Sequence, residues 1–535
     1  MTTAANGPGR LYGVGLGPGD PDLVTVKASR LIGAADVVAY HSARHGRSVA
    51  RSIAEPYLRP GQVEEPLVYP VTTEKSSHPG GYRAAMQEFY ADCARRLAVH
   101  LDAGRTVVVL AEGDPLFYGS YMHLHKRLAH RYRTEVVPGV TSMSGAAAAL
   151  GQPLVEADEV LTVLPGTLPT EELDRRLADT DAAVVLKLGR TFPAVREALA
   201  AAGRLDDAWY VERASTDGER VEPLAGVDPD TVPYFSLALL ASRLGGVATS
   251  VPGDVAATPG PATAVPGDAV AVPGDAEQAR VVNAVSGPGE VVVVGLGPAG
   301  RDWITPQAQA VLAAADDLVG YGPYLDRVAV NPRQRRHPSD NRVEAQRAAY
   351  ALELAADGAR VAVVSSGDPG VFAMAAAVLE VAAEPRWKGV PVRVLPGVTA
   401  AQAVASRVGA PLGHDYCVLS LSDQLKPWPV IERRLLAAAR ADLVIAIYNP
   451  ASRSRTWQLA KARDLLLEHR AAGTPVVLGR DVGGVGERLE VVELAQLDPA
   501  MVDMRTLLIV GSSTTRVAST GDGPPVVFTP RRYPV

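Results

Sequence analysis

The stretch that decides the fold is LYGVGLGPGDPD, residues 11–22, together with its near copy VVVVGLGPAGRD, residues 291–302. In each copy an apolar run passes directly into closely spaced glycines, a pattern typical of a β-strand that ends at a ligand-binding turn. The second copy places Gly295, Gly297 and Gly300 at the G-x-G-x-x-G spacing of dinucleotide-binding folds. The sequence therefore raises the question of whether these turns bind a dinucleotide or another ligand.

Two further blocks recur in the same order after the glycine turns. AEGDPLFYGS (111–120) matches SSGDPGVFAM (365–374), and VPGVTSMSGAAAALGQPL (137–154) matches LPGVTAAQAVASRVGAPL (395–412). The constant order and spacing predict a duplicated module of about 230 residues instead of a short solenoid repeat. The first module is predicted to span residues 11–244 and the second residues 290–518.

The segment between the modules, residues 245–289, is rich in proline, glycine, alanine and valine. It repeats V-P-G-D three times and contains no leucine or aromatic residue, so it cannot bury enough apolar surface to offset the entropy of ordering. We predict a linker there, with an end-to-end distance of about 35–40 Å if it is flexible. Residues 1–10 and 519–535 are predicted to be a flexible N-terminal tail and a C-terminal tail.

Within each module, short runs rich in β-branched residues alternate with runs of helical spacing. This alternation predicts an α/β fold with two tandem modules, each built of two α/β subdomains divided after the PGVT block. Ligands of such sheets bind beyond the carboxyl ends of the strands. All three repeated blocks follow predicted strands, so we expect them to converge on one cleft between the subdomains.

Composition excludes several classes of protein. The chain of 535 residues has a formal charge of −6, which argues against a nucleic-acid binder. Cys93 and Cys417 are far apart without a C-x-x-C, and the ten histidines are scattered, so no metal site is predicted. Without an apolar stretch of about 18 residues or a secretory signal, the sequence predicts a cytoplasmic protein that does not bind membranes.

Details of the glycine turns argue against a dinucleotide. The first copy lacks the third glycine, and Pro18 and Pro298 have no N–H to offer a phosphate. Asp20 would repel a pyrophosphate. The aspartates of the GDP blocks, Asp114 and Asp368, could cap the segment that follows or bind a ligand. Their repetition between the other two blocks favours a shared ligand pocket.

Taken together, the blocks resemble the tetrapyrrole methylase family, enzymes that methylate corrin precursors with S-adenosylmethionine. The first half, through VKASRLIGAADVVAYHSARHGRSVARSIAEPYL, is similar to the precorrin-2 C20-methyltransferases. The second, through GYGPYLDRV and IYNPASRSR, is similar to the precorrin-3B C17-methyltransferases. The resemblance implies a bifunctional enzyme that converts precorrin-2 to precorrin-3A, and precorrin-3B to precorrin-4 with contraction of the ring.

The resemblance also implies one S-adenosylmethionine site per module, in the cleft between its subdomains. In the first module the matching cofactor residues are Pro18, Gly113, Asp114, Phe117, Thr141 and Ser142, with a contribution from around Leu186. In the second they are Pro298, Gly367, Asp368, Val371, Thr399, Ala400 and Tyr448.

Methyl transfer needs alignment of the reactants more than a protein nucleophile, and the sequence contains no convincing catalytic triad. The general base is not identified by the sequence; the candidates for acid–base help are Tyr321, Glu344 and His414, with Tyr324 and Asp423 beside them. A polycarboxylate macrocycle calls for arginine forks. The arginines that follow the second predicted strand of each module suit this role: Arg44, Arg47 and Arg51, and Arg333, Arg335 and Arg336.

Several alternatives stay open on the sequence alone. The chain could act on cobalt-factor II and III in the anaerobic route, or one module could be a non-catalytic scaffold. A duplicated dinucleotide-dependent oxidoreductase is the alternative from another enzyme class. Members of the family pair as homodimers, so the two modules could pair within one chain or between chains.

Overall fold

The computed structural model describes residues 9–44, 46, 48–71, 78–156, 159–178, 180–242, 289–340, 343–424, 426–452, 454–518 and 525–530. Apart from Gly289, the predicted linker lies outside the described residues, and so does Arg47. In the described part of the chain, no helix is long and apolar enough to cross a membrane.

Each module begins with a five-stranded parallel sheet. In the first module the strand order is β3-β2-β4-β1-β5, and the second repeats it as β13-β12-β14-β11-β15. The strands of the first sheet are β1 (Arg10–Gly15), β2 (Val37–Ser42), β3 (Val63–Val68), β4 (Val107–Ala111) and β5 (Arg133–Val137). Those of the second are β11 (Glu290–Gly295), β12 (Asp317–Tyr321), β13 (Arg335–Ser339), β14 (Arg360–Ser365) and β15 (Val392–Leu395). The inner strands are mainly apolar, because both of their faces are buried under helices.

Helices connect these strands and cover both faces of each sheet. In the first module they are α1 (Val26–Ala34), α2 (Val49–Ala54), α3 (Gly81–Asp102) and α4 (Tyr121–Leu128). In the second they are α8 (Pro306–Ala314), α9 (Gly322–Leu325), α10 (Glu344–Ala356) and α11 (Met374–Ala382). A further helix leads out of each sheet from the PGVT block: α5 (Ser142–Leu150) and α12 (Ala400–Val408). The predicted division of each module after the PGVT block is confirmed.

The second subdomains of the two modules form a single ten-stranded sheet, in the order β20-β19-β21-β18-β17-β6-β7-β10-β8-β9. The first module contributes β6 (Leu161–Pro165), β7 (Ala182–Leu186), β8 (Ala208–Glu212), β9 (Arg220–Pro223) and β10 (Ser236–Leu240). The second contributes β17 (Tyr416–Ser420), β18 (Val444–Tyr448), β19 (Pro475–Arg480), β20 (Arg488–Glu493) and β21 (Thr506–Val510). The halves are joined where β6 pairs antiparallel with β17, with Val163 opposite Tyr416.

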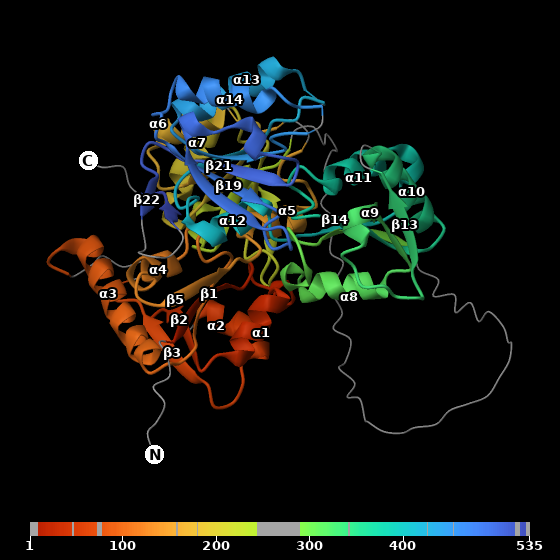
Figure 1. The fold of residues 1–535 in the computed structure, drawn as a ribbon. Coiled ribbons are helices and arrows are strands. Elements are labelled where there is room, and N and C mark those ends of the chain that lie inside the picture. Colours follow the sequence, from red (N-terminus) through yellow and green to blue (C-terminus); the bar gives the residue numbers. More distant parts are fainter. Residues whose placement is uncertain are drawn as a thin grey trace, which may run out of the picture.

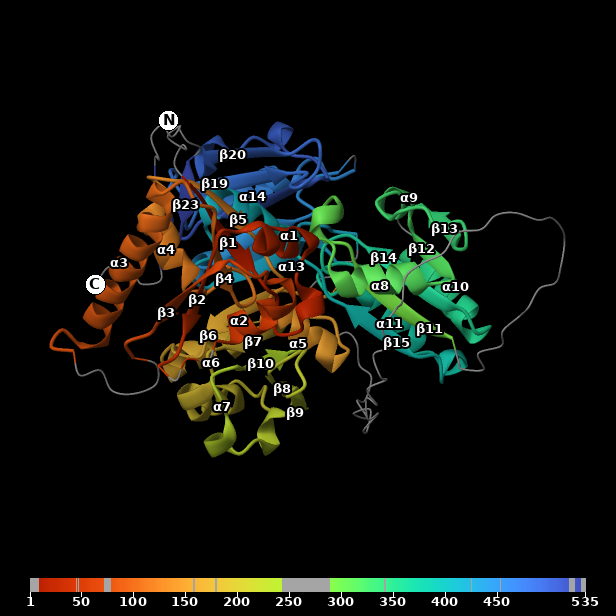
Figure 2. The ribbon, with the colours of Figure 1, turned by 90° about the horizontal axis from the view of Figure 1, so that it is seen from below.

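This sheet is the middle layer of the molecule. Its outer face is covered by α6 (Thr170–Ala178) and α7 (Phe192–Ala201) from the first module and by α13 (Trp428–Arg440) and α14 (Gln458–Leu467) from the second (Figure 1). Its inner face packs on α5 and α12, and one apolar core there draws residues from both modules. The two five-stranded sheets lie beyond that layer, side by side (Figures 1 and 2).

The first subdomains and the chain end also touch across the modules. The N–H of Val26 donates to the carbonyl of Ile304 at 3.2 Å, and Arg30 pairs with Asp302 at 3.1 Å. Strand β23 (Val526–Phe528) lies within the predicted C-terminal tail and pairs with β16 (Gly409–Ala410) and β22 (Arg516–Ala518). Phe528 packs against the core of the first module, with the ammonium of Lys126 4.9 Å from its ring centroid.

Candidate cofactor sites

The glycine turn and the GDP loop of each module are hydrogen-bonded to each other. Gly113 donates to the carbonyl of Gly17 at 2.8 Å and accepts from it at 3.4 Å; Gly367 and Gly297 repeat the arrangement at 2.8 and 3.1 Å. All four glycines have positive φ, between 62° and 78°, which side chains rarely tolerate. The glycines that suggested a phosphate site therefore serve a close approach of two backbone loops.

The PGVT block lies against the same two loops. The glycine turn, the GDP loop and the PGVT block of a module together form what we call its cofactor corner. A Cβ on Gly139 would lie 2.1 Å from the carbonyl oxygen of Gly113, and one on Gly397 would lie 2.3 Å from that of Gly367. Thr141 caps α5 by accepting from the N–H of Ser144, and Thr399 caps α12 by accepting from the N–H of Gln402. The predicted convergence of the three repeated blocks on one place is seen in both modules.

The two GDP aspartates hold this corner together. Asp114 accepts from the N–H groups of Leu116 and Gly139 at 2.9 and 3.3 Å, and Asp368 accepts from Gly370 and Gly397 at 2.9 and 3.1 Å. Both carboxylates are buried, which raises the pKa of Asp114 to about 7 and that of Asp368 to about 6. In this structure the aspartates join the GDP loop to the PGVT loop through backbone donors.

The second subdomain closes over this corner with residues in strained conformations. Six non-glycine residues have positive φ at equivalent positions of the two modules: Tyr118 and Phe372 in the GDP loops, and, at strand ends of the second subdomains, Lys187 and Asn449, and Arg213 and Asp481. Such strain persists where function or surrounding structure requires it. The loop and the facing strand end touch in both modules: Lys187 lies 4.4 Å from the ring centroid of Tyr118, and the rings of Phe372 and Tyr448 lie 5.5 Å apart.

The predicted cofactor residues therefore fall into two groups. One group belongs to the first subdomain and comprises Pro18, Gly113, Thr141 and their counterparts. The other group belongs to the second subdomain, where Leu186 is the last residue of β7 and Tyr448 is the last residue of β18. The hydroxyl of Tyr448 accepts from the N–H of Ala401 at 3.2 Å, and burial raises the pKa of Tyr448 to about 12. Backbone strain at Lys187 and Arg213 could not be read from the sequence, because neither residue type favours positive φ.

Each GDP loop also touches the other module. The N–H of Val155 donates to the carbonyl of Gly370 at 3.3 Å, and the hydroxyl of Ser144 bonds to Asp368. In the opposite direction, the hydroxyl of Tyr118 approaches Asp415 at 3.5 Å, and the ring of Phe117 lies edge-on to Tyr416 at 5.7 Å. Both cofactor corners thus rest on the junction between the modules.

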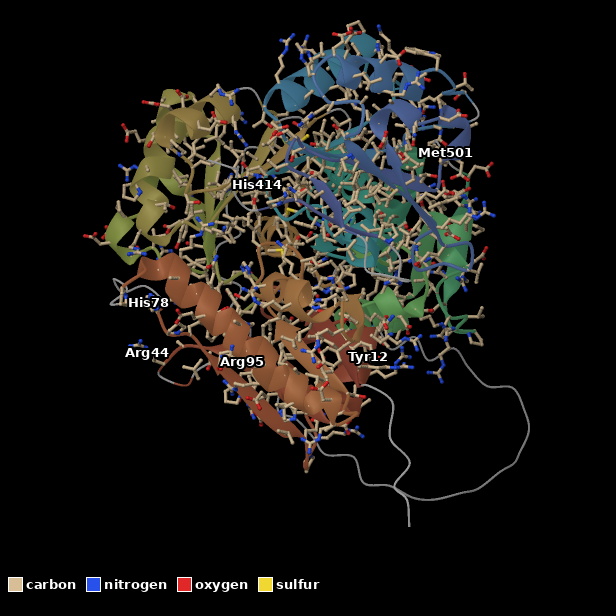
Figure 3. All side chains as sticks on the ribbon, turned by 60° about the vertical axis from the view of Figure 1, so that its left-hand side comes forward. Tyr12, Arg44, His78, Arg95, His414 and Met501 are labelled. Carbon is tan, nitrogen blue, oxygen red and sulfur yellow. The ribbon has the colours of Figure 1, made fainter. Side chains whose placement is uncertain are left out.

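The residues predicted for acid–base help lie in different places. Tyr321 ends β12, with its ring 5.2 Å from that of Tyr324, and Glu344 is the first residue of α10. His414 lies at the module junction, with Nδ1 3.6 Å from Asp415, and Figure 3 shows it well apart from Arg44. Asp423 accepts from the side chain of Gln458 at 2.8 Å.

Most of the predicted substrate arginines are engaged within the protein. Arg51 binds Glu64 at 2.8 Å, Arg335 forms a bidentate pair with Asp317 at 2.6 and 2.7 Å, and Arg336 donates to backbone carbonyls of Leu325 and Val328. Arg44 donates to the carbonyl of Pro70, and Arg333 is exposed.

Arg327, in the GYGPYLDRV motif, was not singled out by the sequence. Its guanidinium donates to the carbonyls of Leu296 and Gly297 at 2.8 Å each and to the hydroxyl of Ser366 at 3.1 Å. Burial lowers the pKa of Arg327 to about 10, and Asp481 in the second subdomain attracts it. Arg327 therefore fixes the glycine turn of the second module.

The sequence matches the tetrapyrrole (corrin/porphyrin) methylases over residues 10–227 and 290–498. These segments make up most of the chain, and the protein belongs to this family. Methylases of the family take their methyl group from S-adenosylmethionine.

Three relatives show how the likeness is distributed. The cobalamin biosynthesis protein CobIJ of Mycobacterium tuberculosis (strain H37Rv) is 62% identical over 98% of this chain and 96% of its own length. The precorrin-2 C(20)-methyltransferase of a Sinorhizobium species is 56% identical over 44% of this chain and 96% of its own length. The precorrin-3B C(17)-methyltransferase of a Sinorhizobium species is 50% identical over 46% of this chain and 97% of its own length.

Proposed function

We propose that the chain is a bifunctional S-adenosylmethionine-dependent C-methyltransferase of corrin-ring biosynthesis. The first module methylates precorrin-2 at C20 to give precorrin-3A, and the second methylates precorrin-3B at C17, with ring contraction, to give precorrin-4. The observation that carries the proposal is the likeness to one full-length relative and, separately, to a whole C20- and a whole C17-methyltransferase. The sequence motifs of the first half indicate C20 methylation, and those of the second half indicate C17 methylation.

Each module holds one S-adenosylmethionine between its two subdomains, and this molecule supplies an electrophilic methyl group. The paired glycines let backbone approach the bound molecule closely. The caps at Thr141 and Thr399 fix the first turns of α5 and α12. The strained residues Tyr118 and Phe372 belong to the GDP loops and help to fix their shape, so the rate enhancement comes chiefly from alignment of the reacting carbon with the methyl group.

The two modules work as a pair within one chain. The pairing of β6 with β17, the shared core on α5 and α12, and the contacts of each GDP loop with the other module support this arrangement. We expect the active protein to have the mass of one chain in sedimentation equilibrium. An active species found only at twice that mass would mean that modules pair between chains.

Matched glycine substitutions test which module performs which reaction. Gly113 and Gly367 both have positive φ, 62° and 67°, so a β-branched residue strains either GDP loop. Gly113→Val should abolish methylation of precorrin-2 and leave that of precorrin-3B, and Gly367→Val should do the reverse. A variant that leaves both reactions intact would assign its module a non-catalytic role.

Substrate assays address the remaining alternatives. Precorrin-2 and cobalt-factor II, supplied in parallel with and without oxygen, should show product with the metal-free ring; product only from the cobalt-bearing ring would place the enzyme in the anaerobic route. Calorimetry with S-adenosylmethionine and NAD(P)H should give heat with the first alone. Binding of NAD(P)H without S-adenosylmethionine would contradict the proposed function.

A further inference from the structure

The residue before the GDP block differs between two otherwise matching corners. Glu112 follows the end of β4, and Ser366 follows the end of β14, while the glycine, aspartate and proline after them are identical. Ser366 accepts from Arg327 at 3.1 Å, whereas Glu112 accepts from the backbone N–H of Ala50 on α2. The two modules therefore place different chemistry at the same point beside the cofactor corner.

Glu112 lies at the carboxyl end of the central strand β4, directly before Gly113 of the cofactor corner. Its side chain is exposed, although Ala111 and Asp114 on either side of it are buried. Tyr69, which follows β3, interacts electrostatically both with Glu112 and with Tyr234 of the second subdomain, so Tyr69 lies near both side chains. The protein that surrounds the carboxyl raises the pKa of Glu112 to about 7.

The second subdomain exposes two aromatic rings, one of which, Tyr234, interacts with Tyr69. Tyr234 and Phe235 are 63% and 44% exposed, and their rings meet edge-on at 5.4 Å. Aromatic side chains left open to solvent at a cleft offer apolar contact to a planar macrocycle. A ring carbon of such a substrate would lie between the rings of Tyr234 and Phe235 and the strand end that carries Glu112.

Other titratable groups at this strand end are already committed. The carboxylate of Asp114 is buried, and each of its oxygens accepts a backbone hydrogen bond. Burial lowers the pKa of His41 to about 4, and His41 packs among Tyr69, Phe89 and Tyr90 on the sheet face that α3 covers. The Tyr69 hydroxyl is bound to Ser120 at 2.6 Å, and burial holds its pKa far above neutrality.

We propose that Glu112 is the proton acceptor of the first module, an inference that rests on the proposed C20 methylation. A bond forms between the ring carbon and the methyl carbon while the S–CH₃ bond breaks, and the electron pair of that bond goes to sulfur, leaving a neutral thioether. The hydrogen on the methylated carbon then passes as a proton to the Glu112 carboxylate. The C–H electron pair returns to the ring and restores its conjugation. A carboxylate that titrates near neutral pH is well matched to this task.

The charged and titratable groups near Glu112 include Arg51, Tyr69 and Asp114. Arg51 lies on α2 near the N–H that Glu112 accepts, but its guanidinium is bound to Glu64 and Glu55. Tyr69, directly after β3, interacts with Glu112, and burial raises the pKa of Tyr69 so far that it stays neutral at the pH of the assay. Because burial also raises the pKa of Asp114 to about 7, a rise of C20 activity with pH through about 7 is assigned to Glu112 only if Glu112→Gln removes it.

Glu112→Gln keeps the size of the side chain and an oxygen that can accept from Ala50. We expect kcat for C20 methylation to fall by about 10²- to 10⁴-fold, the pH-dependent rise near 7 to disappear, and the KM for S-adenosylmethionine to stay unchanged. Methylation at C17 by the same chain reports intact folding. Glu112→Asp should retain the pH-dependent rise at reduced kcat, and Glu88→Gln, on the exposed face of α3, is the matched control.

Two outcomes would overturn the assignment of Glu112. One is a Glu112→Gln variant with unchanged kcat and an unchanged pH profile for C20 methylation. The other is a variant that loses both methylations, because Glu112 would then hold α2 and the fold in place. The proposed function fails in a different way, if the unmodified chain transfers no methyl group to precorrin-2 at any pH.

Discussion

The ion pair between Arg176 and Asp415 links the two modules, and its removal should be costly. Arg176 lies on α6 of the first module, and its Nη1 is 2.7 Å from Oδ2 of Asp415, the residue before β17 of the second. The side chains are only 8% and 2% exposed. Arg176→Ala leaves a carboxylate buried without its cation, which typically costs about 3–5 kcal/mol.

Chemical denaturation followed by circular dichroism measures this cost. Arg175→Ala is the matched control, because Arg175, the neighbouring residue on the same helix, is 58% exposed and its pair with Glu172 should contribute about 1 kcal/mol or less. The double variant Arg176→Ala/Asp415→Ala should recover much of the lost stability, since neither charge is then buried alone. A cost for Arg176→Ala as small as that of the control, or strictly additive effects, would refute the buried junction.

Three further predictions concern thiols, a histidine and a glycine. Burial raises the pKa of Cys93 and Cys417 to about 12, so neither thiol should react with a thiol reagent at pH 8 until the protein is unfolded; fast native-state labelling would contradict their burial. His41 has a pKa lowered to about 4, and the unfolded chain therefore binds more protons below pH 6.5. Stability contributed by His41 is present above pH 6.5 and is lost as the pH falls towards 4. In His41→Phe the slope of unfolding free energy against pH over that range should change by up to about one proton, whereas an unchanged slope would show that His41 does not titrate this way. A Cβ on Gly145 would lie 2.8 Å from Cγ of Pro18, so Gly145→Ala should displace the glycine turn, at a cost of about 1–3 kcal/mol. Gly145→Ala should therefore raise the KM for S-adenosylmethionine in C20 methylation. The KM in C17 methylation should not change, because the second module already has Ala403 at the equivalent position. An unchanged KM in C20 methylation would show that the glycine turn does not contribute to cofactor binding.

The arrangement of the cofactor corners was largely predictable from the sequence. Parallel strands end at one edge of a sheet, so three blocks that each follow a strand had to meet there. The repeats at Gly113 and Gly367 fixed the correspondence between modules. Pro18 and Pro298 correctly argued against a phosphate cradle, since the glycines around them pack loop against loop.

Long-range partners were not predictable. The pairing of β6 with β17 depends on two strand edges whose residues, Leu161 to Val163 and Tyr416 to Val418, are buried and, apart from Thr162, apolar like those of other strands. Arginines could be counted but not assigned, because a sequence does not show that Asp317 already neutralises Arg335. Arg327 acts through backbone carbonyls, which leave no trace in the sequence.

The number of S-adenosylmethionine sites per chain tests the account most directly. Calorimetric titration of the purified chain with S-adenosylhomocysteine, the product that competes for the same cleft, should saturate at two molecules per chain. Gly113→Val and Gly367→Val should each reduce that number to one. Saturation at a single molecule in the unmodified chain, or the loss of both sites in either variant, would contradict the assignment of one cofactor site to each module.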